Sequence, residues 1–173
     1  MRQFGIFVAF TLAAVLFTQT ACCRSKNGPE NGERPREGSH TITLRSGGKL
    51  LFSYIGPHYQ LFLNNKEILT TTADSVYSQE NFDIPDLEAE VHLLCEWDNN
   101  ALCQAAYRFI TFYRNGDIDI SKAFGACGAL KAVRQQGNAV EAVILYEDDD
   151  QSVYSWEGSV LKKIGEVLAY NLD

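Results

Sequence analysis

The chain has 173 residues, with 15 Lys and Arg against 22 Asp and Glu, which gives a formal net charge of −7. This length predicts one domain. An acidic balance argues against a nucleic-acid partner and against electrostatic docking on anionic lipids, because both need clustered Lys and Arg. It permits a basic protein partner.

Residues 1–21 have the order of a secretory signal peptide. A basic residue, Arg2, is followed by an apolar stretch over 4–17, and small or polar residues 18–21 then lead to a cysteine. The apolar stretch is shorter than the roughly 20 residues that span a bilayer. We therefore expect residues 1–21 to be removed after export, with an uncleaved membrane anchor as the alternative.

The residues Thr20, Ala21 and Cys22 resemble the cleavage site of bacterial lipoprotein precursors, although Gln19 stands where an aliphatic residue is usual. In that class, the cysteine after the small residues receives a lipid and the signal is cut just before it. The resemblance implies lipidation of Cys22 and attachment to the membrane through the lipid anchor. Cys23 occupies the position where Asp retains such proteins at the inner membrane, so the resemblance implies the outer membrane.

Residues 24–39 contain no aliphatic or aromatic side chain, but they do contain two prolines and three glycines. Such a segment cannot bury apolar surface to offset its chain entropy. Residues 22–39 are therefore predicted to be a lipidated, disordered tether that spans roughly 20–25 Å.

Residues 40–173 are predicted to form a single β-rich domain, because short apolar and polar alternations are separated by Gly, Pro and Asn turns. In the first half, strands are predicted at 41–44, 50–55, 58–63 and 67–70. Residues 71–86 are polar and irregular, and they predict a long loop.

The second half repeats this rhythm, and Asn115-Gly116 is its strongest hairpin signal. Strands are predicted at 88–97, 106–113, 117–121, 129–135, 139–146, 152–157 and 160–164, with a strand or short helix at 165–173. The fold class is all-β, as an antiparallel sandwich or a barrel-like meander of about ten short strands.

The five cysteines are Cys22, Cys23, Cys95, Cys103 and Cys127. Lipidation of Cys22 would explain the odd number and leave four, which allow three pairings. We favour a Cys103–Cys127 disulfide, which ties the start of one hairpin to the loop after its second strand, and Cys95–Cys103 is the rival. Closing the favoured loop stabilises by about 3–4 kcal/mol in the chain-entropy model.

Residues 103–110, together with 124–127, resemble small exported bacterial proteins of no assigned activity. This resemblance implies the same Cys103–Cys127 pairing and brings no activity with it. Metal binding by thiolates is disfavoured, because there is no CxxC motif and an oxidising compartment removes thiolates.

No residue pattern predicts catalysis. The spacing of His40, His58 and His92 indicates no shared site, and solvent-facing strand positions are expected for them. Asp117 and Asp119 are expected on the wet side of one strand, about 7 Å apart. We therefore predict no catalytic residue, metal ligand or cofactor, and no enzyme.

Tyr and Trp concentrate at protein interfaces. Trp97, beside a polar loop, is the best candidate for an exposed anchor, and Tyr107 is another possible interaction residue. The expected function is that of an envelope lipoprotein whose β-domain binds another envelope protein. The alternatives are an inhibitor or immunity protein against an envelope toxin or hydrolase, and an envelope enzyme whose site is assembled across strands.

Overall fold

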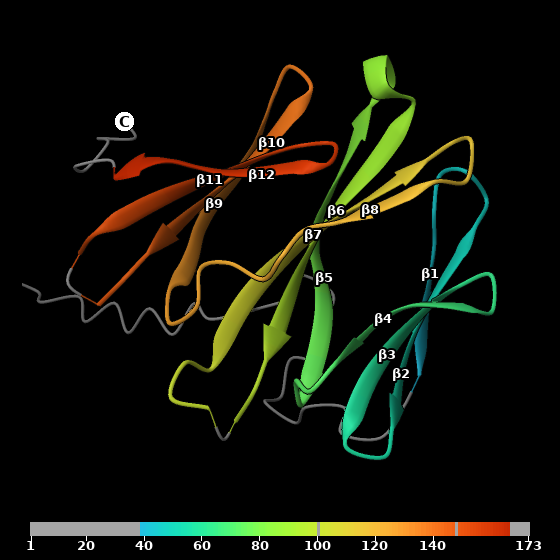
Figure 1. Ribbon diagram of the computed structural model, residues 1–173, viewed down its shortest axis with the longest axis horizontal. Coiled ribbons are helices and arrows are strands. Elements are labelled where there is room, and N and C mark those ends of the chain that lie inside the picture. Colours follow the sequence, from blue (N-terminus) through green and yellow to red (C-terminus); the bar gives the residue numbers. More distant parts are fainter. Residues whose placement is uncertain (1–38, 100, 148, 167–173) are drawn as a thin grey trace, which may run out of the picture.

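A computed structural model describes residues 39–99, 101–147 and 149–166. They form twelve strands in three antiparallel sheets of four, and each sheet is a meander of consecutive strands (Figure 1). The first sheet contains β1 (His40–Thr43), β2 (Lys49–Ile55), β3 (His58–Leu63) and β4 (Lys66–Thr71). The second contains β5 (Ser75–Ile84), β6 (Ala89–Trp97), β7 (Ala105–Tyr113) and β8 (Ile118–Ile120). The third contains β9 (Ala129–Gln136), β10 (Ala139–Leu145), β11 (Gln151–Glu157) and β12 (Val160–Glu166).

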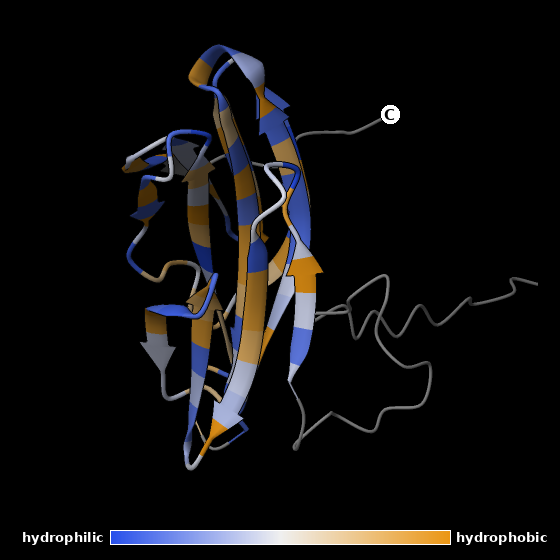
Figure 2. Ribbon diagram, turned by 90° about the vertical axis from the view of Figure 1, so that its right-hand side faces the viewer, coloured by the Kyte–Doolittle hydropathy of each residue, from blue (hydrophilic) through white to orange (hydrophobic). Residues whose placement is uncertain are grey.

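The prediction of an all-β antiparallel fold is confirmed, in the form of a sandwich with the second sheet in the middle. Hydrophobic residues alternate with hydrophilic ones along the strands, as Figure 2 shows. The central strand β6 is buried over eight consecutive residues, from 89 to 96, because both of its faces are covered. Cys22, the predicted signal peptide and residues 22–38 of the predicted tether lie outside the described residues.

Two hydrophobic cores lie on the two faces of the central sheet. Leu94, Ile110 and Phe112 face the first sheet, in a core whose other buried members are Leu44, Leu50, Phe52, Tyr59, Leu61, Ala73 and Val76. Val91, Leu93 and Phe109 face the third sheet, in a core whose other buried members are Ile84, Cys95, Ala105, Tyr107, Phe124, Val140, Ala142, Ile144 and Trp156. Such burial on both faces is the environment of a strand inside a three-layer fold.

The loop predicted at 71–86 is wrong, because most of that segment is the strand β5, which pairs with β6 from Ser75 to Ile84. A bulge between Ser78 and Glu80 shifts the register. It sends Val76 into one core and Ile84 into the other, although an even spacing places two residues of a regular strand on the same face. The bulge therefore hides the alternation by which a strand is recognised.

A hydrogen-bond chain joins the second and third sheets inside their shared core. The indole Nε1 of Trp156 donates to Oγ1 of Thr111 at 2.7 Å, and that hydroxyl donates to the carbonyl oxygen of Gly158 at 2.9 Å. The ring of Phe109 stacks on the Trp156 indole with a centroid distance of 6.2 Å. Because the indole N–H of Trp156 and the hydroxyl of Thr111 both have hydrogen-bond partners, Trp156 can be buried at little cost in free energy.

The described residues contain no helix of the length and apolar character needed to span a bilayer. The only helical turn among them is a 3-10 turn, η1 (Pro85–Leu87), which connects β5 to β6.

Replacing Gly128 with Ala should destabilise the domain. A Cβ atom at Gly128 would lie 2.1 Å from Cγ2 of Ile144, inside the core between the second and third sheets. Overpacking of this kind costs about 1–3 kcal/mol, which urea unfolding would measure. The control is Gly48→Ala, whose Cβ would meet its nearest atom at 3.4 Å. Equal stability losses in the two variants would contradict this account of the packing.

Candidate functional site

A row of polar side chains lies on the face of β6 that the first sheet covers. Glu90 is 8% exposed, His92 is 2% exposed and Glu96 is 9% exposed. Alternating polar residues usually indicate a wet face, and a solvent-facing position was expected for His92. That expectation is wrong, because the first sheet packs over this row. Buried charges are tolerated only when they are paired and hydrogen-bonded.

One end of the row is a line of hydrogen bonds through His92. Its Nε2 lies 2.8 Å from Oε1 of Glu90, and its Nδ1 lies 3.1 Å from Oγ of Ser78. The second carboxylate oxygen of Glu90 accepts the backbone N–H of Arg45 at 2.7 Å. The Arg45 guanidinium lies 3.0 Å from Asp83 of β5. These bonds fix the turn between β1 and β2 against the central sheet.

The other end of the row is a second ion pair. Oε1 of Glu96 accepts a hydrogen bond from Nε of Arg108 at 2.5 Å, and Oε2 accepts one from Oγ1 of Thr71 at 2.9 Å. Arg108 also donates through Nη1 to the carbonyl oxygen of Ser121 at 2.7 Å. Because Thr71 ends β4, this cluster joins the last strand of the first sheet to the central sheet.

Ser78, His92 and Glu90 form a hydroxyl–imidazole–carboxylate line, which is the order of groups used in nucleophilic catalysis. Here both ring nitrogens of His92 are engaged and the side chain is almost fully covered by the first sheet. Burial raises the pKa of Glu90, but the hydrogen bonds from His92 and Arg45 and their positive charge outweigh burial. The net result is a pKa below the ordinary value, as for a carboxylate that stabilises packing.

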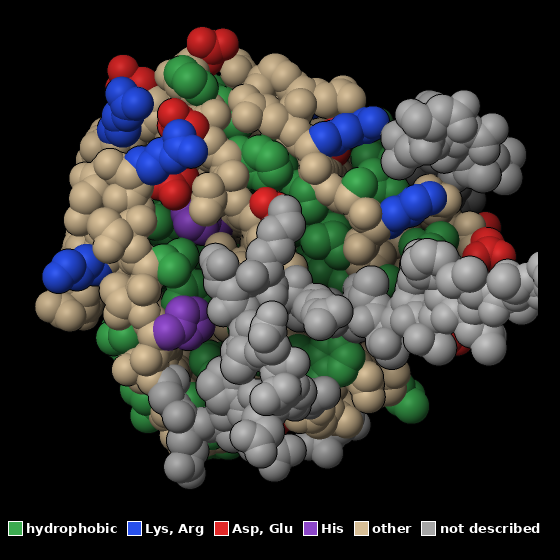
Figure 3. Space-filling view, turned by 180° about the vertical axis from the view of Figure 1, so that it is seen from behind, with side chains coloured by type: hydrophobic (Ala, Val, Ile, Leu, Met, Phe, Trp, Pro, Cys, Tyr) green, Lys and Arg blue, Asp and Glu red, His purple; other side chains and the backbone are tan. Residues whose placement is uncertain are grey.

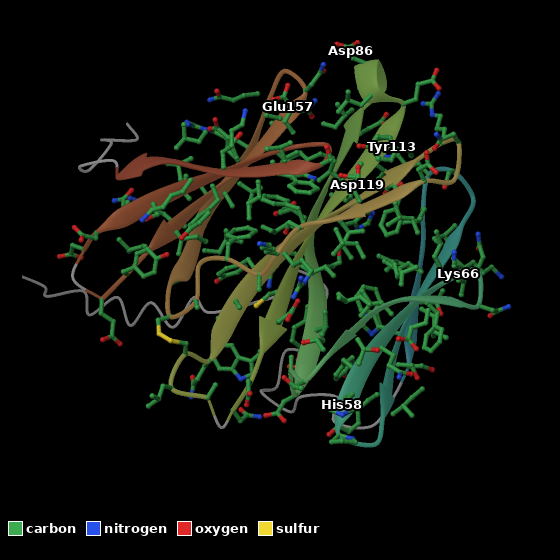
Figure 4. All side chains as sticks on the ribbon, viewed as in Figure 1. His58, Lys66, Asp86, Tyr113, Asp119 and Glu157 are labelled. Carbon is green, nitrogen blue, oxygen red and sulfur yellow. A yellow bond between two sulfur atoms is a disulfide. The ribbon has the colours of Figure 1, made fainter. Side chains whose placement is uncertain are left out.

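The other candidate polar residues do not converge. The ring of His40 stacks on Phe52 at 4.3 Å, and burial lowers its pKa. His58 lies at the turn between β2 and β3, at the opposite end of the molecule from Asp86 (Figure 4). Within the described part of the chain, no group of three or more His, Cys, Asp or Glu could hold a metal ion.

Asp117 and Asp119 were predicted to share the solvent-facing side of a strand. Each accepts a hydrogen bond from a different residue. Asp117 lies in the turn before β8 and accepts a hydrogen bond from Nδ2 of Asn115 at 2.8 Å. Asp119 accepts one from the hydroxyl of Tyr113 at 3.0 Å, and Figure 4 shows these two side chains next to each other. Burial and the nearby Asp119 raise the pKa of Tyr113.

The structure contains the disulfide that the sequence favoured. Cys103, just before β7, is bonded to Cys127, just before β9, with 4.3 Å between their Cα atoms (Figure 4). The rival pairing of Cys95 with Cys103 is therefore wrong. Cys95 is fully buried in the core between the second and third sheets.

Trp97 is half-buried, so it is not a freely exposed anchor. It packs against the core between the second and third sheets, and its Nε1 donates to Oδ1 of Asn99 at 3.2 Å. The backbone N–H of Asn99 in turn donates to Oδ2 of Asp74 at 2.8 Å. These hydrogen bonds link the end of β6, where Trp97 is the last residue, to the loop that follows it and to the residue before β5.

Tyr107 cannot contact a surface partner, because it is fully buried. Its hydroxyl donates to the carbonyl oxygen of Gly128 at 3.3 Å and accepts the backbone N–H of Leu130 at 2.9 Å. The interaction role predicted for Tyr107 is therefore wrong, because its strand position faces inward.

The exposed apolar residue that sequence reasoning missed is Leu102, whose relative exposure of 105% is the highest among the large hydrophobic residues described. It is the residue immediately before Cys103, which forms the disulfide with Cys127. We call Leu102, Cys103, Ala126 and Cys127 the disulfide tip. An apolar residue between a polar turn and a cysteine is the signal that could have identified it.

Comparisons of the chain with models of protein families, with curated proteins and with solved structures gave no match.

Acid should weaken the domain through Glu90. Its pKa in the folded state lies below the ordinary 4.5, so its stabilising effect is complete above pH 4.5 and is lost as the pH falls through the folded value. Glu90→Gln should lower the free energy of unfolding at pH 7 by about 1–3 kcal/mol. It should also reduce the further decrease in the free energy of unfolding between pH 7 and pH 3. Urea unfolding between pH 3 and pH 7 measures both. The control is Glu157→Gln, which changes an exposed carboxylate. If the two variants had the same pH profile, Glu90 would not be the group responsible.

Proposed function

We propose that the protein is a bacterial lipoprotein, anchored in the cell envelope through a lipid on Cys22, whose β-domain binds another envelope protein. The signal-like residues 1–21 and the small residues before Cys22 support the anchor. Its place is the outer membrane, because Cys23 rather than Asp follows the lipidated position. Several acyl chains on one cysteine hold a protein to a membrane firmly.

The observation that carries the binding role is the disulfide tip. Leu102 extends fully into solvent, and the disulfide between Cys103 and Cys127 fixes the backbone beneath it. The backbone N–H of Asp98 also donates to the carbonyl oxygen of Gln104 at 2.8 Å across the base of the loop. An apolar side chain on a fixed base loses little entropy on binding, so it suits insertion into an apolar pocket of a partner.

The charge of the domain favours a basic partner. Export without residues 1–21 would remove Arg2 and no acid, which makes the protein one unit more negative than −7. Lys and Arg side chains are scattered over the face seen in Figure 3 rather than gathered in one patch. Charges of opposite sign accelerate the encounter of such partners.

A second candidate is an inhibitor or immunity protein against an envelope toxin or hydrolase. The acidic charge and the fixed apolar tip favour it, since an inhibitor needs a rigid element that enters a cleft. Adding the protein should then reduce the activity of a hydrolase or toxin, and adding the Leu102→Asp variant should leave that activity unchanged. This result would distinguish inhibition from binding without inhibition.

Cys22→Ala should prevent lipidation and leave an uncut precursor or a protein released from the membrane. Fatty-acid labelling and fractionation of cell envelopes measure this. Cys23→Ala is the matched control and should remain labelled. Continued labelling of Cys22→Ala would show that the anchor is elsewhere.

A photo-crosslinking amino acid placed at position 102 should trap a discrete envelope protein in intact cells. The same amino acid at Val160, which is 49% exposed in the third sheet, is the control. A crosslinked product at position 102 and none at position 160 would support binding through the disulfide tip. An excess of the domain without the photo-crosslinking amino acid should prevent this crosslink, whereas an excess of the Leu102→Asp domain should not. Identical bands from positions 102 and 160 would contradict it.

A further inference from the structure

The edges of the three sheets differ in how they are protected. An edge strand offers unpaired N–H and C=O groups to other chains, and charged side chains or bulges usually discourage such pairing. Five of the six edge strands among the described residues carry at least one charge, and several also have a bulge. These charged residues are Lys66 and Glu67 on β4, Glu80 and Asp83 on β5, Asp119 on β8, Lys131 and Arg134 on β9, and Lys162 and Lys163 on β12.

The sixth edge, β1, has no such protection. It consists of His40, Thr41, Ile42 and Thr43, with no Asp, Glu, Lys, Arg or Pro, and its register with β2 contains no bulge. Its one titratable side chain, His40, stacks on Phe52. No described strand lies beyond β1 in the first sheet, which is the sheet at the right of Figure 1.

The hydrogen-bond pattern shows which backbone groups of β1 point outward. The N–H of Leu44 donates to the carbonyl oxygen of Gly48 at 2.8 Å, so these two residues form a hydrogen-bonded pair. Such pairs alternate along an antiparallel ladder. Ile42 and His40 therefore bond to β2, whereas the N–H and C=O groups of Thr41 and Thr43 face away from the sheet.

We propose that β1 binds β1 of a second copy of this chain, antiparallel, about a two-fold axis at Ile42. In this register, Thr41 of each copy faces Thr43 of the other, and the pair exchange both of their hydrogen bonds. The Thr side chains also form favourable cross-strand pairs on the outer face. The two Ile42 residues oppose each other at a close position on the core face, where Ile42 already packs.

The strand is self-complementary, and this is why a second copy is the occupant. A two-fold axis requires one surface to fit itself, and an uncharged Thr-Ile-Thr edge does so without bringing like charges together. The first sheets of two copies would join into one continuous sheet. The pairing depends on neither the lipid on Cys22 nor the disulfide tip, so its failure and the failure of the proposed function are separable.

The test is the oligomeric state of the full chain, purified in a mild detergent, by analytical ultracentrifugation across a concentration series. The unchanged protein should reach a dimer, and Thr43→Lys should raise the dissociation constant about tenfold or more, because edge lysines block pairing. Thr70→Lys is the matched control, since Thr70 lies exposed on the other edge of the same sheet. It should dimerise like the unchanged protein.

Two further variants separate loss of pairing from loss of folding. Thr41→Pro removes an outward N–H and leaves the ladder with β2 intact, so it should give a folded monomer by circular dichroism. Ile42→Cys should give a disulfide-linked dimer in intact envelopes, because close pairs in an antiparallel ladder bring Cα atoms to about 4.5 Å. Thr43→Lys should abolish that band. A monomer at all concentrations, or equal loss in Thr43→Lys and Thr70→Lys, would overturn the proposal.

Discussion

The structure depends on a central strand that is buried on both faces. Because neither face of β6 is exposed to water, each of its polar side chains needs a hydrogen-bond partner within the protein. Glu90 and Glu96 meet this need at the two ends of the strand, and each also reaches the first sheet. The groups that are hardest to bury thus set the position of the first sheet on the second. An apolar strand in the same place would bury as much surface but would leave that position less defined.

Most strands could be predicted because alternation and turns are local properties. The turn at Asn115-Gly116 and the strands on either side of it are read from adjacent residues, and the structure has them in place. The disulfide was also within reach, since four cysteines allow few pairings. The strand β5 was not, because its bulge breaks the alternation and its polar residues read as loop.

The candidate site was harder to predict because alternation gives the two faces of a strand but not what covers each of them. The polar row of Glu90, His92 and Glu96 reads as a wet face, and only the stacking of a third layer makes it interior. The interaction role predicted for Tyr107 was wrong for the same reason, because its hydroxyl forms its hydrogen bonds inside the core. Leu102 was not predicted because the sequence criterion for an interaction residue was an aromatic side chain, and Leu102 is aliphatic. What covers a face is decided by residues far away in the sequence.

The order of the strands has a further consequence, for the way in which the protein folds. Every strand pairs only with its neighbours along the chain, so each sheet is complete within one contiguous stretch of sequence. The loops that must close are short, which keeps contact order low for an all-β protein and favours rapid assembly. A chain that emerges from a pore with its N-terminus first could form the three layers one after another. Each completed layer would then serve as a template for the next.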